Sequence, residues 1–242
     1  MISVLSIANS FGQDAQRYLH GIAKADGTEL TCVNLYIGGC SLWRHFKNMK
    51  ADAAEYSLEF NGESTGFFTD IKTALLSRRW DYVTLQQASH ESPEFKNYEP
   101  YLPCLADCVR EYAPEAKLAI HQTWAYAQGS QRLHEELGYA DQHDMFRDIE
   151  AAYAQAAGMV QADLVIPAGR AMMNLAEAGL PAHRDGFHAS LGAGRYAIAL
   201  TWYHALTGRD IAENSFKDFD VPVTGEEIAI ARKAAVEAFS DR

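Results

Sequence analysis

The sequence lacks the features that mark membrane-spanning and nucleic-acid-binding chains. None of its stretches approaches the roughly 20 consecutive apolar residues that a transmembrane helix needs. Its 242 residues carry 21 Lys and Arg against 32 Asp and Glu, a formal net charge of −11. The compact basic group around Arg44, Lys47 and Lys50 is too small to outweigh this excess. Because nucleic acids and anionic membranes bind to clustered Lys and Arg, we expect neither partner.

Disulfide and metal-binding patterns are also missing. The four cysteines form neither a C-x-x-C pair nor the paired spacing of a zinc site, so we expect buried free thiols in a reducing compartment. The sequence contains neither H-E-x-x-H nor G-x-x-x-x-G-K, and we predict no metal and no other cofactor.

The first apolar stretch lacks a basic flank and breaks at Asn9, so we expect no signal peptide and a cytoplasmic location.

Short apolar runs alternate with helical patterns along the chain. Five runs are partly β-branched and too short for helices, which predicts buried strands. These strands are expected at 2–8, 29–39, 81–87, 117–124 and 163–169. Helices are expected at 13–24, 41–50, 68–78, 144–161, 190–207 and 225–238. The alternation favours a parallel sheet covered by helices, and the length without a Pro- or Ser-rich linker favours one domain over 1–242.

Two regions depart from this alternation. Asn61-Gly62 lies between short extended pieces at 56–65 and is a strong signal for a β-hairpin. The segment 88–115 is less regular and holds several prolines, so we expect it to form a lid or wall near the site.

Polar residues follow the predicted strands at the edge where open parallel sheets bind their ligands. The first strand ends at Asn9 and Ser10, the second at Gly38-Gly39 and the third at Gln86-Gln87. Ser at a junction between a strand and a helix is often only the N-cap of that helix, and Ser10 alone fits either role.

These residues, together with a distant Asp-x-x-His pair, supply the parts that acyl transfer needs. Ser10 would be the nucleophile, and His188 the general base that a serine hydroxyl requires at neutral pH. Asp185, three residues earlier, would accept the Nδ1–H of His188, while His183 is the alternative base. The backbone amides of Ser10 and Gly39 can form an oxyanion hole, to which a glutamine side chain can add a third donor.

The order of these motifs resembles that of the SGNH (GDSL-like) hydrolases. The segments SIANSFGQDA, YIGGCSLWRH, DYVTLQQASH and DGFHASLGAGRYAIALTW together resemble the DUF4886 branch of that superfamily, over nearly the whole chain. The resemblance implies a flavodoxin-like, three-layer α/β/α fold with a central five-stranded parallel sheet. It also implies a serine esterase that acts on carboxylic esters, including acetyl groups on sugars.

The chain departs from the superfamily's usual pattern in two blocks. Ala8-Asn9-Ser10 stands where Gly-Asp-Ser is usual, and we expect Asn9 to hydrogen-bond the neighbouring loops at the substrate site. Gln86-Gln87 stands where Gly-x-Asn is usual, which makes Gln87 the first choice and Gln86 the second for the side-chain oxyanion donor.

Two further residues are candidates for substrate binding. His45, on the predicted helix after the second strand, either points at the pocket or lies on a solvated face. Trp124, after the fourth strand, either contacts a sugar ring or acyl group or belongs to the core. The predicted substrate is a small-molecule or carbohydrate ester with a short acyl group. A binding protein without efficient chemistry and an acyltransferase using the same triad are the alternatives, and the oligomeric state is left open.

Overall fold

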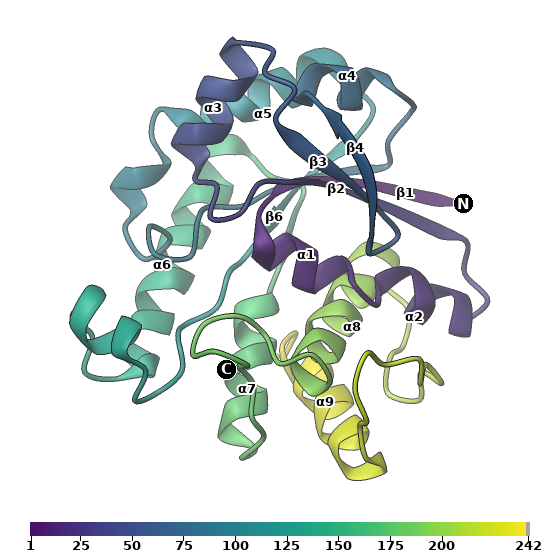
Figure 1. Ribbon diagram of the computed structural model, residues 1–242, viewed down its shortest axis with the longest axis vertical. Helices are drawn as coiled ribbons and strands as arrows, with labels where there is room; N and C mark the ends of the chain where they lie inside the picture. Colours follow the sequence, from purple (N-terminus) through teal and green to yellow (C-terminus); the bar gives the residue numbers. More distant parts are fainter. Residues whose placement is uncertain (241–242) are drawn as a thin grey trace.

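The computed structural model describes residues 1–240, in which a mixed sheet lies between two layers of helices (Figure 1). The sheet has seven strands in the order β4-β3-β2-β1-β5-β6-β7. Its parallel strands are β1 (Ile2–Ala8), β2 (Leu30–Tyr36), β5 (Tyr82–Leu85), β6 (Lys117–His121) and β7 (Leu164–Ile166). Each of them lies within one of the five predicted strand ranges, so the predicted α/β fold with a parallel sheet is confirmed.

An antiparallel hairpin makes the sheet wider than the five strands predicted. β3 (Tyr56–Phe60) pairs with β2, and β4 (Glu63–Thr69) forms the outer edge. The turn residues Asn61 and Gly62 both have positive φ, 51° and 82°, as a tight two-residue hairpin turn requires. Asn61 Oδ1 also accepts the backbone N–H of Cys32 at 3.0 Å, which fixes the turn to β2. The sequence predicted the hairpin, whereas its pairing with β2 depends on this tertiary contact.

Helices cover both faces of the sheet, as predicted for a three-layer α/β/α fold (Figure 1). One layer holds α3 (Leu42–Lys50), α4 (Ile71–Leu76), α5 (Tyr101–Tyr112) and α6 (Gln142–Val160). The other holds α1 (Ser10–Gln16), α2 (Leu19–Ala25), α7 (Ala168–Glu177), α8 (Ala193–Thr207) and α9 (Gly225–Glu237). Within residues 1–240, no helix has the length and apolar character needed to cross a bilayer.

The first helix differs from its prediction in a way that defines the role of Ser10. The predicted helix 13–24 divides into α1 and α2, and α1 already begins at Ser10. Asn9 is the N-cap, because its Oδ1 accepts the backbone N–H of Phe11 at 3.0 Å. Ser10 is therefore the first residue inside the helix, and its hydroxyl is not used for capping.

Within residues 1–240, two α-helices and two single-turn helices were not predicted from the sequence. The short ones are a 3-10 helix at Phe95–Tyr98 and a π-helix at Arg132–Glu136. The segment 88–115 is more regular than expected, since it contains α5, which packs against α3 and α6. α7 begins only two residues after β7, inside the range 163–169 that was predicted as strand.

The start of α7 lies close to the segment after β6, which predicts how replacing Gly169 by alanine changes stability. A Cβ added at Gly169 would lie 2.3 Å from the backbone oxygen of Thr123 and 2.8 Å from Phe146 Cε2. Gly169→Ala is therefore expected to lower the free energy of unfolding by about 1–3 kcal/mol, the usual cost of overpacking, in urea denaturation.

Gly158→Ala on α6 is the matched control. A Cβ at Gly158 has no heavy atom within 4 Å. The free energy of unfolding of this variant is therefore expected to rise by about 0.5–1 kcal/mol, because alanine has a higher helix propensity than glycine. Equal changes in the two variants would show that the contact at Gly169 is not the cause.

Candidate active site

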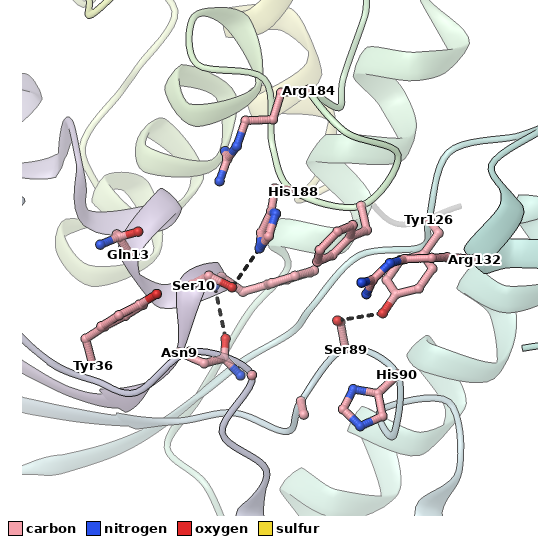
Figure 2. A pocket seen from close by; sticks show the side chains of 15 residues that line it. Asn9, Ser10, Gln13, Tyr36, Ser89, His90, Tyr126, Arg132, Arg184 and His188 are labelled. Atoms are coloured by element: carbon pink, nitrogen blue, oxygen red, sulfur yellow. Dashed lines mark hydrogen bonds between the residues drawn. The ribbon is translucent and has the colours of Figure 1, made fainter. Parts of the chain in front are cut away.

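Ser10 and His188 meet at the edge of the sheet where the parallel strands end (Figure 2), and Asp185 contacts His188 there. The Ser10 Oγ atom lies 2.8 Å from His188 Nε2, and His188 Nδ1 lies 2.7 Å from Asp185 Oδ2. A carboxylate accepts and cannot donate, so the Nδ1 atom carries the proton and Nε2 is left to accept one from Ser10. The structure thus brings together the three residues predicted for the triad, in the order of contacts that a Ser-His-Asp triad uses.

The turn that contains Asp185 explains the orientation of the imidazole. Asp185 Oδ1 accepts the backbone N–H groups of His188 at 2.8 Å and Phe187 at 3.3 Å, which leaves Oδ2 directed at Nδ1. Gly186 has a φ of 88°, a conformation that favours glycine at this turn. Burial raises the pKa of Asp185, but the hydrogen bonds from His188 outweigh burial and hold that pKa below its usual value. The carboxylate is therefore ionised at neutral pH and stabilises a protonated imidazole.

Two backbone amides next to Ser10 are available as oxyanion donors. Among residues 1–240, the N–H groups of Ser10 and Gly39 have no hydrogen-bond acceptor, and both residues line the same cavity. Gly39 has a φ of 62° in a turn closed by the bond from Cys40 N–H to Ile37 O at 3.2 Å. Asn9 Nδ2 donates to Cys40 O at 3.0 Å and so ties this turn to the start of α1, as expected for a residue that bonds the neighbouring loops.

Gln87, the first choice for a side-chain oxyanion donor, is turned away from the cavity. Its side chain is fully buried, and its Oε1 accepts the backbone N–H groups of Leu42 at 2.9 Å and Ala88 at 2.8 Å. Its Nε2 donates to Asn97 O at 2.9 Å. The prediction for Gln87 is therefore wrong, because its amide binds three backbone groups instead of facing a ligand.

Gln86, the second choice, is also engaged inside the protein. Its Nε2 donates to Asn9 Oδ1 at 2.7 Å, and its Oε1 lies 2.9 Å from His121 Nδ1. Gln86 thus supports the cap of α1 and does not line the cavity. The prediction of a glutamine donor is wrong for both residues, and the available donors are backbone amides.

The structure decides between the alternatives for Trp124 and for the base, and it corrects the prediction for His45. His45 is fully buried, with Nδ1 2.9 Å from the Tyr56 hydroxyl, so it is a core residue and not a substrate contact. Trp124 is buried as well and belongs to the core. It donates its Nε1–H to Phe187 O at 2.7 Å and so holds the backbone next to His188. His183 donates Nε2–H to Ala125 O at 2.9 Å, which leaves His188 as the imidazole beside Ser10.

The cavity in front of Ser10 has a volume of about 400 Å³ (Figure 2). Its lining includes Ser10, Gly39, Asn9 and His188 from the sequence prediction. The lining also includes residues that were not predicted from the sequence, namely Tyr36, His90, Tyr126, Arg132 and Arg184. Tyr36 is the last residue of β2 and could have been found from its place at a strand end, whereas Arg132 lies in a polar stretch without any periodic signal.

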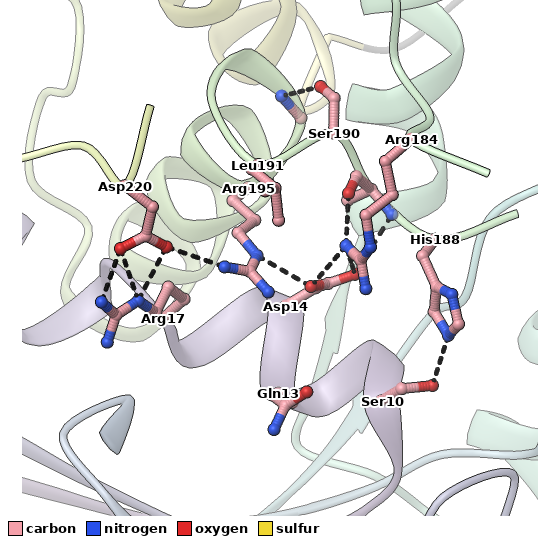
Figure 3. A network of polar contacts seen from close by, with 12 residues as sticks. Ser10, Gln13, Asp14, Arg17, Arg184, His188, Ser190, Leu191, Arg195 and Asp220 are labelled. Carbon is pink, nitrogen blue, oxygen red and sulfur yellow. Dashed lines mark hydrogen bonds and ion pairs between the residues drawn. The ribbon is translucent and has the colours of Figure 1, made fainter. Parts of the chain in front are cut away.

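A fully buried carboxylate, Asp14, lies beside this cavity (Figure 3). Both of its oxygens accept hydrogen bonds from Arg184 Nη1 at 2.9 Å, and Oδ1 also accepts from Arg195 Nε at 2.8 Å. Arg195 continues the network to Asp220 at 2.8 Å, and Asp220 pairs with Arg17 at the surface. The charge of Asp14 is therefore balanced by two arginines inside the protein.

Asp14 joins the helix of Ser10 to the loop of His188. It lies one helical turn after Ser10 in α1, and its Oδ2 accepts the backbone N–H of Ala189 at 3.1 Å. Arg184 and Ala189 flank the 185–188 segment, so Asp14 holds both ends of that segment against α1.

Asp14→Asn is expected to damage stability and the Ser10–His188 geometry together. Removing one member of a buried charge cluster leaves the arginines without a counter-charge, which costs about 3–5 kcal/mol. Urea denaturation and the rate of Ser10 labelling by a fluorophosphonate measure the two effects. Glu63→Gln, at the exposed end of the network beside Arg17, is the matched control with little expected change. Unaltered stability and labelling in Asp14→Asn would show that the cluster does not hold the site.

The pH dependence of stability follows from two buried histidines, His45 and His121, and one partly buried histidine, His183. Burial lowers the pKa of His45 and of His121 to about 3, and that of His183 to about 4. The unfolded chain has histidine pKa values of about 6.5, so below that pH it takes up protons that the folded chain does not bind. The free energy of unfolding is therefore expected to fall between about pH 6.5 and 4, by up to about 1.4 kcal/mol per pH unit for each ring.

Urea unfolding at several pH values between about 7.5 and 5 measures this slope. His183→Gln is expected to make this slope shallower, because one of the three rings is then absent and unfolding takes up about one proton fewer. A free energy of unfolding that stays constant over this range would contradict the burial of neutral rings.

Sequence and structure comparisons identify the family. The DUF4886 family, described as a domain of unknown function, matches residues 3–238. A DUF4886 family protein from Bacteroides uniformis is 37% identical to this chain, covering 98% of this chain and 94% of that one, and its crystal structure superposes with a TM-score of 0.92. Curated proteins gave no match.

Two more distant structures share the fold. A candidate SGNH hydrolase from Slackia heliotrinireducens is 23% identical and covers 85% of this chain and 98% of its own, with a TM-score of 0.59. An acetylxylan esterase from Geobacillus stearothermophilus is 16% identical, and the match covers 85% of this chain and 94% of that one, with a TM-score of 0.52. The resemblance noted in the sequence is thus confirmed: this chain has the α/β/α fold of the SGNH hydrolases and belongs to the DUF4886 family.

Proposed function

We propose that this chain is a serine esterase that uses Ser10 as nucleophile, His188 as general base and Asp185 as the group that orients the base. The observation that carries the proposal is the continuous chain of contacts from Ser10 Oγ to His188 Nε2 at 2.8 Å and from His188 Nδ1 to Asp185 Oδ2 at 2.7 Å. Ser10 and His188 also line a cavity, so a substrate can reach the Ser10 hydroxyl.

The reaction follows from the positions of the protons. Ser10 Oγ attacks the ester carbonyl while its proton passes to His188 Nε2, and the imidazolium is stabilised by Asp185. His188 then gives that proton to the leaving alcohol as the C–O bond breaks, which leaves an acyl group on Ser10. A water molecule then gives a proton to His188 and attacks the acyl carbonyl. The bond between the acyl carbon and Ser10 Oγ breaks, the carboxylic acid leaves, and His188 returns its proton to Ser10 Oγ.

The oxyanion that forms in each step needs donors in fixed positions. The backbone N–H groups of Ser10 and Gly39 have no acceptor among residues 1–240 and lie at the mouth of the cavity. Both are held by backbone structure, the first by the start of α1 and the second by the turn at Gly39. Donors that are already in place cost no reorganisation when the charge develops, which is the usual basis of oxyanion stabilisation.

The substrate class in this proposal is a short-chain carboxylic ester of a small molecule or carbohydrate. A cavity of about 400 Å³ fits a ligand of that size. The distant likeness to an acetylxylan esterase is in keeping with acetyl groups on sugars as substrates. The cytoplasmic location predicted from the sequence is part of the same proposal.

Ser10→Ala tests the proposal directly. The native chain is expected to hydrolyse 4-nitrophenyl acetate and to be labelled at Ser10 by a fluorophosphonate, whereas Ser10→Ala is expected to lose the label and at least about a thousandfold in kcat. Ser89→Ala is the matched control for labelling, because Ser89 also lines the cavity but bonds the Tyr126 hydroxyl and not an imidazole.

Three outcomes separate this function from the alternatives. Absence of both label and hydrolysis in the folded native chain would indicate a binding protein. Transfer of the acyl group to an added alcohol or sugar in preference to water would indicate an acyltransferase. Equal turnover in Ser10→Ala would remove Ser10 from the mechanism.

A further inference from the structure

Arginines line the cavity beside Ser10 in a chain that is strongly negative. The formal net charge of the whole chain is −11. Among residues 1–240, the side chains that line the cavity include Arg132 and Arg184 and neither aspartate nor glutamate. A guanidinium at the wall of a cavity is a binding group for an anionic part of a ligand.

The two arginines differ in how their charge is balanced. Arg184 is paired with the buried Asp14 carboxylate, whose oxygens both lie 2.9 Å from its Nη1 atom. Arg132 has a looser partner, since Glu136 Oε1 lies 3.9 Å from its Nε and both side chains are about half exposed. Arg132 is therefore the arginine whose charge is available to a ligand in the cavity.

Aromatic rings hold Arg132 near His188 (Figure 2). The Arg132 guanidinium lies 4.0 Å from the centre of the Phe187 ring, and that ring lies 3.9 Å from the His188 ring. The guanidinium also borders the Tyr126 hydroxyl, which bonds Ser89 Oγ at 2.9 Å. A guanidinium stacked on a ring keeps its in-plane N–H groups free, and their spacing matches the two oxygens of a carboxylate.

We propose that this site takes esters that carry a carboxylate group, which Arg132 binds while Ser10 attacks the ester carbonyl. The proposal rests on the esterase function proposed above and names the substrate class of that same site. The carboxylate belongs either to the acyl part or to the alcohol part of the ester, and in both cases it forms the same ion pair with Arg132.

Two matched pairs of esters test the proposal on the full chain. Mono-4-nitrophenyl glutarate against 4-nitrophenyl valerate places the carboxylate on the acyl part. 4-Acetoxybenzoate against 4-methylphenyl acetate places it on the alcohol part. In at least one pair the carboxylate ester is expected to have a kcat/KM about tenfold higher, the ratio that one hydrogen bond between charged groups supplies. The pair with the larger ratio identifies the part that carries the charge.

Variants at Arg132 connect this preference to one side chain. Arg132→Gln is expected to raise KM for the preferred carboxylate ester about tenfold and to change the neutral ester less, while Arg132→Lys retains part of the preference. Added salt is expected to weaken the preference, because the guanidinium is partly exposed. Arg147→Gln is the matched control, since Arg147 pairs with Asp144 on α6 and does not line the cavity.

The outcomes distinguish this proposal from the esterase function itself. Equal kcat/KM values within both pairs, or equal losses for both members in Arg132→Gln, would overturn the carboxylate proposal and leave the esterase intact. If Ser10 is not labelled and no ester is hydrolysed, the esterase function fails. Calorimetric titration with glutarate then still tests the carboxylate site, and equal affinities in the native chain and in Arg132→Gln would overturn it.

Discussion

A carboxylate without access to water needs all of its partners inside the protein. Asp14 has them at both ends of the segment that carries Asp185 and His188, and in α8. Its two arginine partners compensate the buried charge, while the bond from Ala189 fixes the chain directly after His188. Asp14 and Ser10 are separated by one turn of the same helix, so their relative positions are set by the backbone. The distance from the nucleophile to its base is thus determined by a buried ion cluster, which tolerates little displacement.

A second set of polar contacts organises the ends of the strands. His121 at the end of β6 contacts Gln86 after β5, Gln86 donates to Asn9 after β1, and Asn9 donates to Cys40 beside the turn that follows β2. Four neighbouring strand ends are therefore connected by consecutive side-chain hydrogen bonds. The side-chain amides of Asn9 and Gln86 are used here within this set of contacts, so the oxyanion donors that we propose are backbone N–H groups.

The sequence predicted those parts of the site that depend on local order along the chain. Ser10 follows an apolar strand, and Asp185 lies three residues before His188, so both could be identified from spacing. The failures concern the direction of side chains. Gln87 lies next to the site in sequence but turns inward to three backbone partners, and His45 is covered by Tyr56 only because the hairpin joins the sheet. Arg132 reaches the cavity through tertiary packing on Phe187, for which its polar surroundings in the sequence give no signal.

The turn from Asp185 to His188 has a mechanical consequence. Asp185 binds both the imidazole and the backbone of its own turn, so the carboxylate and the imidazole form one unit within four residues. Ser10 belongs to another element, and one direct hydrogen bond connects it to this unit. Because Asp14 in α1 also binds Arg184 and the backbone of Ala189, the loop cannot move away from α1 without taking partners from a buried carboxylate. Opening of this loop therefore carries the cost of an unpaired buried charge, so the resting fold keeps Ser10 and His188 engaged before any ligand arrives.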